Sequence, residues 1–462
     1  MRKTSDCVNT LHAYVPAGYP AQELPWAYIS VGIVFVFLDS IGFPGTYVNV
    51  TGEALRYAVE IISFAVQAAV LIRFAVRGSL TGLAKKISDY LPVLLFLAVV
   101  TSVSVIGTSD LKAQFVSCAR LAVTCMFALW MAEHIHVKNT LWLYLFAQAI
   151  YVALAVCYQL LFPELRSVSA AYAHTFTGIT GVKNGTASVL CLGIAIQLIL
   201  YLLEFHDGNK LPPVFTGFLI LQEILLIMTE STSATAFSLV LVAATAVFTG
   251  NRRHNPGLMC TALSIGFVAV IGYVLPAFSG ILALLGKDTL LTGRIPIWQQ
   301  LVTVIGKSHT LTGYGYGHFW LDNSAVAAFH SAFSKYSFFG RMRSGAHNDV
   351  IELLVNTGIT GVAAFYAMLV TVFRKKRMSA VGWHQYCFCF IFLLVFTMHG
   401  LTERSWTTHG SMTMLLFYAT GLACKGAKYI KTGTKPKTEQ VWKHRIYALP
   451  QLLRRTKGNG KP

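Results

Sequence analysis

The sequence predicts an all-α, polytopic membrane protein with about 12 transmembrane helices and one large loop that carries short helices. Of its 462 residues, 55% are hydrophobic and only 12% are charged, which is about half the charged fraction of an ordinary soluble domain. Apolar runs recur along the chain at close to the ~20 residues that a helix needs to cross a bilayer. Lys and Arg gather in alternate connecting segments, as they do in membrane proteins of fixed orientation.

Twelve apolar segments qualify as candidate spans, and each predicts one helix. They lie near 27–43, 57–76, 91–107, 114–132, 140–162, 186–203, 214–228, 234–249, 258–285, 351–373, 384–401 and 411–424. The segments at 214–228 and 234–249 are among the shortest. We therefore expect nine transmembrane helices within residues 1–285 and three more within residues 351–424.

The positions of Lys and Arg predict which side of the membrane each segment faces. With the N-terminus in the cytoplasm, 25 of the 37 Lys and Arg fall on the cytoplasmic side, including the run Arg374-Lys375-Lys376-Arg377. That side then carries the whole net charge of +18. The loop 286–350 lies on the opposite, trans side.

The basic C-terminal tail, residues 425–462, is expected to lie in the cytoplasm. Its charge favours contact with anionic membrane lipid, since each Lys or Arg near such a surface contributes about 1 kcal/mol. A net charge of +18 could also indicate nucleic-acid binding, but the tail lacks interleaved aromatic residues in a folded module. We therefore expect membrane lipid, and no nucleic acid, as its partner.

The nine cysteines fall inside apolar runs, at their ends or in the polar N-terminus, and the loop 286–350 holds none. No disulfide framework is therefore expected. Cys387 and Cys389 form a C-x-C pair in an apolar segment, but no second pair or histidine cluster completes a metal site. We expect no metal and no other cofactor. The N-terminus, with about 25 mixed polar residues before the first apolar run, does not have the pattern of a signal peptide.

The trans loop has the length and the local patterns of a functional segment. Loops of this length between compact spans are unusual and tend to carry function. Residues 294–305 have apolar side chains at helical spacing, which predicts a short helix. The segment Gly313-Tyr-Gly-Tyr-Gly317 predicts a tight, irregular turn.

Three polar motifs lie where predicted helix ends meet the trans interface, so they could converge on one cavity. They are Thr292-Gly-Arg294 after the ninth span, Ala346-His347-Asn348-Asp349 before the tenth, and Gly181-Val-Lys183-Asn184 before the sixth. A planar guanidinium suits phosphate oxygens bidentately, and a histidine suits general base work. The pattern therefore favours group transfer from a phosphate-linked donor.

Each motif also has a purely structural interpretation. Arg294 at an interface could be a snorkelling anchor, and His347 could cap a helix or lie on the surface. Lys183 and Asn184 could be no more than an interface anchor and an N-cap. The residues alone leave these alternatives open.

The C-terminal half of the chain resembles the O-antigen ligase and polymerase family of bacterial membrane glycosyltransferases. His347-Asn348, nine residues and then Gly358-Ile-Thr-Gly361 fit the family pattern H-[NSQ]-x9-G-x-x-[GTY]. Further likeness over residues 170–425 comes from Arg294 with Trp298, Gly313-Tyr-Gly315 with Phe319, Lys183-Asn184, and Thr402-Glu403. The sequence departs from the family at Ser231-Thr-Ser233, where an Arg often follows.

The resemblance implies transfer of a glycan from an undecaprenyl diphosphate carrier to an acceptor hydroxyl. The enzyme would be inverting and metal-independent, and would lie in the bacterial inner membrane with its active site facing the periplasm. The acceptor would be lipid A–core for a ligase, another lipid-linked repeat unit for a polymerase, or pilin for some relatives. Ligation to lipid A–core in lipopolysaccharide biosynthesis is the first expectation.

The resemblance also implies roles for individual residues. His347 would be the general base, and Asn348 or Glu403 would orient its imidazole or the sugar, although Glu403 could instead pair with Arg404. The donor diphosphate would be bound first by Arg294, then by Lys183 with Asn184, and then by Arg341 or Arg343. Gly358 and Gly361 would lie three and four turns along one helix and admit a neighbouring helix or the carrier lipid.

Two classes of protein that are not enzymes compete with this interpretation. Secondary transporters commonly have twelve spans, but they usually show repeat symmetry and a midplane substrate site, whereas the two halves of this chain do not look alike. A lipid-linked oligosaccharide flippase would share the compartment but would not need the His347-Asn348 element.

Overall fold

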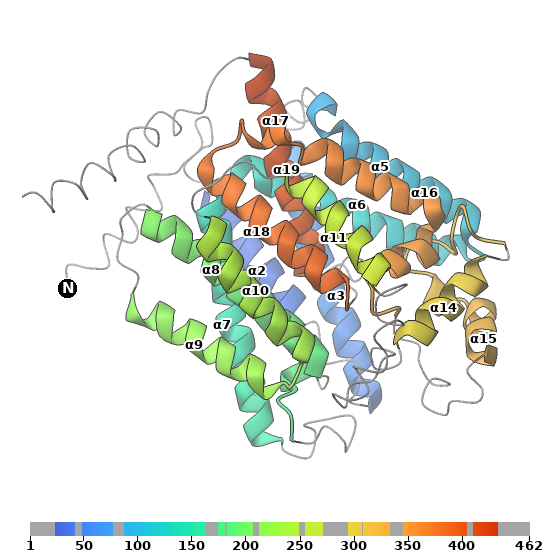
Figure 1. The fold of residues 1–462 in the computed structure, drawn as a ribbon, viewed down its shortest axis with the longest axis horizontal. Coiled ribbons are helices and arrows are strands. Elements are labelled where there is room, and N and C mark those ends of the chain that lie inside the picture. Colours follow the sequence, from blue (N-terminus) through green and yellow to red (C-terminus); the bar gives the residue numbers. More distant parts are fainter. Residues whose placement is uncertain are drawn as a thin grey trace, which may run out of the picture.

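The computed structural model describes residues 24–41, 49–76, 87–162, 174–180, 183–206, 212–248, 255–270, 294–306, 308–332, 345–403 and 410–432. Within these residues the regular structure is helical, which confirms the all-α class (Figure 1). The α-helices are α2 (Leu24–Phe35), α3 (Asn49–Val76), α5 (Ile87–Gly107), α6 (Leu111–His134), α7 (Val137–Leu161), α8 (Lys183–His206), α9 (Pro213–Met228), α10 (Thr232–Phe248), α11 (Pro256–Ala269), α14 (Arg294–Ile305), α15 (Asn323–Ala332), α16 (Asp349–Val372), α17 (Lys375–Met378), α18 (Trp383–Gly400) and α19 (Ser411–Thr432).

Each of the twelve predicted apolar segments coincides with a helix, although only the first part of segment 258–285 is described, as α11. Five helices are long and apolar enough to cross a membrane: α5, α6, α7, α8 and α16. The helices α9, α10 and α11 are apolar but shorter. The chain therefore has the character of a multi-pass membrane protein, and the count of twelve spans stays a prediction.

The helices pack side by side around a common apolar core, with α5 against α16, α6 against α19, and α18 against both α19 and α8 (Figure 1). Large apolar side chains also point outward, as expected of surfaces that face lipid. Examples from four helices are Phe115 (76% exposed), Leu160 (69%), Val214 (80%) and Ile265 (65%).

Buried glutamines connect α7, α8 and α9. Gln148 on α7 donates to Gln222 on α9 over 3.2 Å, Gln222 donates to Gln197 on α8, and all three are fully buried. In an apolar surrounding each amide needs a partner, so such contacts hold helices together and fix their rotation. Gly193 leaves space for these side chains, because a Cβ there would collide with Gln222.

The helix α16 is broken at Gly358. This residue has φ 65° and ψ −174°, a conformation that is essentially restricted to glycine. The break frees backbone groups of the helix, and the segment 310–315 binds them. Tyr314 N–H donates to Val355 O over 2.9 Å, and Ile359 N–H donates to Thr310 O over 2.9 Å.

The segment 313–317 forms the irregular turn that the sequence predicts. Gly313, Gly315 and Gly317 all have positive φ, at 65°, 99° and 70°. The turn is wedged between helices, because a Cβ on Gly313 would collide with the backbone of α16 and one on Gly107 would collide with Gly313. The break in α16 and the glycine turn therefore interlock. Together they position the N-terminal end of α16, which His347 precedes by two residues.

The prediction that Gly358 and Gly361 lie on one helix and admit a neighbouring helix or the carrier lipid was wrong. The two residues do not lie on one continuous helix, because the chain leaves helical geometry at Gly358. The close neighbour of Gly358 is the backbone of Leu311, and a Cβ on Gly361 would meet the side chain of Thr357 across the break. Gly358 therefore accommodates the protein's own turn, and Gly361 leaves space for Thr357.

A substitution of Gly358 by alanine tests this interlock. An L-residue in that backbone conformation costs about 1–3 kcal/mol, and its Cβ would also collide with Leu311. We expect Gly358→Ala to lower the midpoint of thermal unfolding in detergent and the yield of folded protein. Gly266→Ala in α11 is the matched control, because nothing lies within 4 Å of a Cβ there. Equal behaviour of the two variants would contradict the interlock.

Candidate functional site

The carboxylate of Glu403 lies at the centre of a polar cluster. Arg294 Nη2 donates to Glu403 Oε1 over 2.6 Å, and Asn184 Nδ2 donates to the same oxygen over 3.1 Å. His347 Nδ1 lies 2.8 Å from Glu403 Oε2. Asn184, Arg294, His347 and Glu403 are called the Glu403 cluster below. Three motifs that are far apart in the sequence therefore meet, as the sequence predicts.

The cluster is built from helix ends. Arg294 is the first residue of α14, Asn184 is the second of α8, and His347 lies two residues before α16. Glu403 follows the C-terminal end of α18, which ends at Gly400. The N-termini of α8, α14 and α16 thus lie close together with their positive dipole ends, an arrangement that suits an anion.

His347 and Asn348 divide two tasks between them. Asn348 is the N-cap of α16, since its Oδ1 accepts from Val350 N and Ile351 N over 2.9 and 3.0 Å. Its Nδ2 donates to Leu401 O over 2.9 Å, which ties α16 to the end of α18. The capping role considered for His347 is therefore filled by Asn348. His347 itself has φ 50°, an uncommon backbone conformation outside glycine.

The charge of Glu403 sets the tautomer of His347. Burial raises the pKa of Glu403, but the hydrogen bond and charge of His347 and the charge of Arg294 together lower it below its ordinary value. An ionised carboxylate can only accept hydrogen bonds, so the Nδ1 of His347 must donate. In the neutral ring, Nε2 then carries the lone pair, which is the form that a general base needs.

Ala346, the residue before His347, has both its backbone N–H and its carbonyl oxygen hydrogen-bonded. Ala346 N–H donates to Glu352 Oε2 over 2.7 Å, and Trp298 Nε1 donates to Ala346 O over 2.7 Å. Glu352 is 1% exposed and also accepts from the indole of Trp320 over 3.1 Å. Sequence reasoning missed Glu352, although an acid in the first turn of an apolar helix is a signal for such a role.

A second layer of polar contacts orients Asn184. Ser231 Oγ donates to Asn184 Oδ1 over 3.3 Å, so the amide nitrogen of Asn184 is turned toward Glu403. Ser188 Oγ donates to Asn184 O over 2.7 Å and lies 2.6 Å from His399 Nε2. Ser231 belongs to the Ser231-Thr-Ser233 motif, after which the family often has an Arg, and here its hydroxyl contacts the cluster.

The remaining predicted residues are placed as follows. Lys183 is the first residue of α8 and adjoins Asn184 in sequence, but no contact of its side chain with Glu403 is described. Arg341 and Arg343 lie outside the described residues, as does Arg404, the alternative partner of Glu403. Within the described ranges, no group of three His, Cys, Asp or Glu side chains could hold a metal ion.

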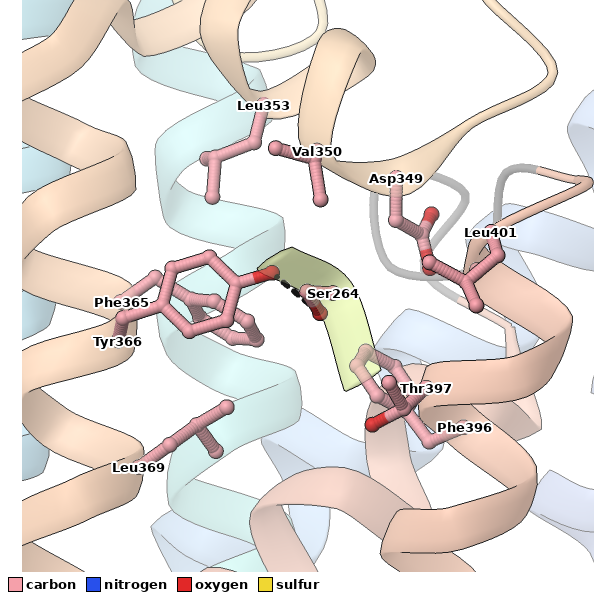
Figure 2. Close-up of a pocket in the computed structure, with 11 residues that line it drawn as sticks. Ser264, Asp349, Val350, Leu353, Phe365, Tyr366, Leu369, Phe396, Thr397 and Leu401 are labelled. Carbon is pink, nitrogen blue, oxygen red and sulfur yellow. Dashed lines mark hydrogen bonds between the residues drawn. The ribbon is translucent and has the colours of Figure 1, made fainter. Parts of the chain in front are cut away.

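A small pocket lies beside the cluster, between α11, α16 and α18 (Figure 2). The carboxylate of Asp349 faces it from the start of α16, and Tyr366 on α16 donates to Ser264 on α11 over 3.0 Å across it. Its volume of about 20 Å³ is room for about one water molecule. Gly400 allows Asp349 to pack closely, because a Cβ on Gly400 would collide with that carboxylate.

Comparison with known proteins agrees with the motifs. Residues 216–366 match the family model described as O-antigen ligase. The resemblance to the O-antigen ligase family is thus confirmed. The matched stretch includes Arg294 and His347, whereas Asn184 and Glu403 lie outside it.

A curated relative is similar to a larger part of the chain. The exopolysaccharide production protein ExoQ of Rhizobium meliloti (strain 1021) is 27% identical over 235 residues, which cover 49% of this chain and 53% of that protein. The chain therefore spans about half the length of this relative.

Proposed function

We propose that the protein is a membrane glycosyltransferase of the O-antigen ligase and polymerase type. It transfers a glycan from an undecaprenyl diphosphate carrier to an acceptor hydroxyl. The observation that carries this proposal is the Glu403 cluster, which joins a guanidinium, an imidazole and a carboxylate. A cation suits the leaving diphosphate, and an imidazole with a free lone pair suits the attacking hydroxyl.

In this mechanism the acceptor oxygen attacks the anomeric carbon of the donor sugar while the bond from that carbon to the diphosphate oxygen breaks. His347 Nε2 takes the acceptor proton, and Glu403 stabilises the imidazolium that forms. Arg294 keeps one N–H group on Glu403 and uses others for the diphosphate. Attack from the side opposite the leaving group inverts the anomeric centre.

The acceptor in this proposal is lipid A–core, which makes the reaction O-antigen ligation in lipopolysaccharide biosynthesis. The likeness to ExoQ favours a second candidate, the polymerisation of exopolysaccharide repeat units on their carrier. The surface glycan of a deletion strain distinguishes them. Bare lipid A–core with polymer left on its carrier supports ligation, whereas loss of polymer itself supports polymerisation.

Transfer by the purified protein decides whether it is an enzyme at all. We expect the protein in detergent to move glycan from carrier to acceptor without a membrane. A transporter or a flippase would move its substrate only across a sealed bilayer. Flipping in proteoliposomes without any transfer in detergent would overturn the proposed function.

A substitution of Arg294 by lysine tests diphosphate recognition. Lysine keeps the charge but has one ammonium, which cannot hold Glu403 and a phosphate in the same fixed geometry. We expect Arg294→Lys to lose about 10–100-fold in kcat/KM, nearly as much as Arg294→Ala, since a hydrogen bond to a charged group contributes about 1.5–3 kcal/mol. Arg120→Lys is the matched control, because Arg120 pairs with Glu60 at 3.1 Å. Normal donor binding by folded Arg294→Ala would place phosphate recognition elsewhere.

The proposed location is the bacterial inner membrane, with the Glu403 cluster facing the periplasm. Cysteine labelling at the exposed Ser324 of α15 tests the orientation. The background needs replacements of Cys7 and of Cys157, which is exposed. We expect a membrane-impermeant maleimide to label Ser324→Cys in cells whose inner membrane is intact. Labelling that requires permeabilisation of that membrane would overturn the orientation.

A further inference from the structure

The carboxylate of Glu352 is buried in the first turn of α16 and has no part in the proposed chemistry. Its residue is 1% exposed, and none of the contacts described for the Glu403 cluster includes it. A charged group in such surroundings is costly unless hydrogen bonds satisfy it. An acid that is kept inside an apolar helical bundle is therefore a candidate for a functional role.

Among the described residues, three N–H donors from different segments contact this carboxylate. Ala346 N–H donates to Oε2 over 2.7 Å, and the indole of Trp320 in the 3₁₀ turn η8 (Phe319–Leu321) donates to Oε1 over 3.1 Å. Asn356 Nδ2 donates to Oε1 over 3.3 Å and to the backbone oxygen of Glu352 over 2.7 Å. Glu352 therefore joins η8, the chain before α16 and the last turn of α16 before its break.

These donors suit a carboxylate better than an amide. Both oxygens of Glu352 accept hydrogen bonds, and an ionised carboxylate is an acceptor only. Glutamine has the same shape, but its N–H₂ group would face either Ala346 N–H or the indole of Trp320. Since a buried donor without an acceptor is costly, Glu352→Gln disturbs these contacts without creating a cavity.

Ala346 connects Glu352 to His347. Its N–H is held by Glu352, and its carbonyl oxygen accepts from Trp298 Nε1 over 2.7 Å. The backbone that leads into His347 is therefore fixed on both sides of Ala346. His347 follows with φ 50°, a strained conformation that persists only where the surroundings determine it. From this backbone its Nδ1 reaches Glu403 Oε2 at 2.8 Å.

We propose that Glu352 is a positioning residue for His347, because through Ala346 it fixes the backbone from which the imidazole reaches Glu403. The kinetic consequence rests on the proposed function, since it concerns the base of that reaction. Glu352 itself touches neither substrate and carries no proton in the reaction. Without it the ring turns away from Glu403, and the hydrogen bond that keeps the proton on Nδ1 is lost.

The kinetic test combines Glu352→Gln with Glu403→Gln in the purified full-length protein. We expect Glu352→Gln alone to lower kcat about 10–100-fold, the worth of a hydrogen bond to a charged group, at unchanged KM and donor affinity. Residues that act as one unit have non-additive effects, so the double variant should be no slower than Glu403→Gln. A double variant whose loss is the product of the two single losses would overturn the proposal, as would an unchanged kcat of folded Glu352→Gln.

The tautomer of His347 tests the positioning without any substrate. Nitrogen-15 spectra of histidine-labelled protein distinguish a ring protonated at Nδ1 from one protonated at Nε2, and His347→Asn assigns the signal. We expect the proton on Nδ1 in the wild type, and a shift toward Nε2 in both Glu352→Gln and Glu403→Gln. An unchanged spectrum of folded Glu352→Gln would overturn the proposal. If the wild type transfers nothing but this shift occurs, the proposed function fails and the positioning role stands.

Two further variants complete the comparison. Glu60→Gln is the matched control and should change neither kcat nor the tautomer, because Glu60 lies on α3 and pairs with Arg120 at 3.1 Å. Trp320→Phe replaces Glu352→Gln if that variant yields too little folded protein. It removes one donor to Glu352 but keeps an aromatic ring beside Phe329. We expect kcat to fall about 2–10-fold, with a partial shift of the tautomer. Wild-type values of both would overturn the proposal.

Discussion

Replacing His347 by asparagine is expected to lower turnover by about 10²–10⁴-fold, the usual contribution of a general base. Asparagine tolerates the positive φ of 50° found at this position, so the backbone should keep its course. The α16 N-cap is Asn348 and stays intact. Asparagine cannot take the acceptor proton, and that loss alone should slow the reaction.

The measurement is steady-state transfer by purified His347→Asn together with binding of the lipid-linked donor. We expect normal expression and donor affinity, with a fall confined to kcat. His330→Asn on α15 controls for the loss of a histidine from the same region of the chain. Turnover close to that of the wild type would remove His347 from the chemistry.

A substitution of Glu403 by glutamine is expected to lower turnover by a similar factor, although Glu403 need not touch the substrate. The amide places an N–H₂ group where a carboxylate oxygen accepted from His347. The ring would then accept at Nδ1 and carry its proton at Nε2, which is the wrong tautomer for a base. The corresponding change in a Ser-His-Asp triad costs about 10⁴-fold.

The pH dependence of thermal stability tests whether the ionised carboxylate of Glu403 contributes to the fold. The pKa of Glu403 lies below its ordinary value of 4.5, so its contacts add stability above that value. This contribution is lost as the pH falls through the lower pKa of the folded state. The difference in thermal midpoint between the wild type and Glu403→Gln should therefore shrink in acid. A constant difference from pH 7 to pH 3 would show that the ionised contacts contribute nothing.

Much of this site could be predicted because its residues belong to short motifs at helix ends. The charge-based topology placed Asn184, Arg294 and His347 at the same end of the bundle, and the family resemblance added Glu403. The structure brings the four into contact. Local sequence patterns also predicted the helix at 294–305 and the glycine turn at 313–317.

The interlock and the supporting contacts could not be predicted in this way. The break at Gly358 lies inside an apolar run, where hydropathy and periodicity continue unchanged across it. Its partner is a turn more than forty residues upstream, and no local rule pairs the two. Ser231 was considered only as part of the Ser231-Thr-Ser233 motif after which an Arg is missing, because a hydroxyl has no sequence signature that shows which amide it will bind.

The central position of Glu403 has a consequence for the timing of biosynthesis. Asn184 and Glu403 are separated by 219 residues, and the ribosome makes Asn184, Arg294, His347 and Glu403 in that order. Chains emerge and fold from the N-terminus onward, so the imidazole has no carboxylate partner until α18 is in place. A nascent or truncated chain would therefore hold its histidine and arginine without the group that orients them. Catalytic competence would arrive only when the last part of the helical bundle is assembled.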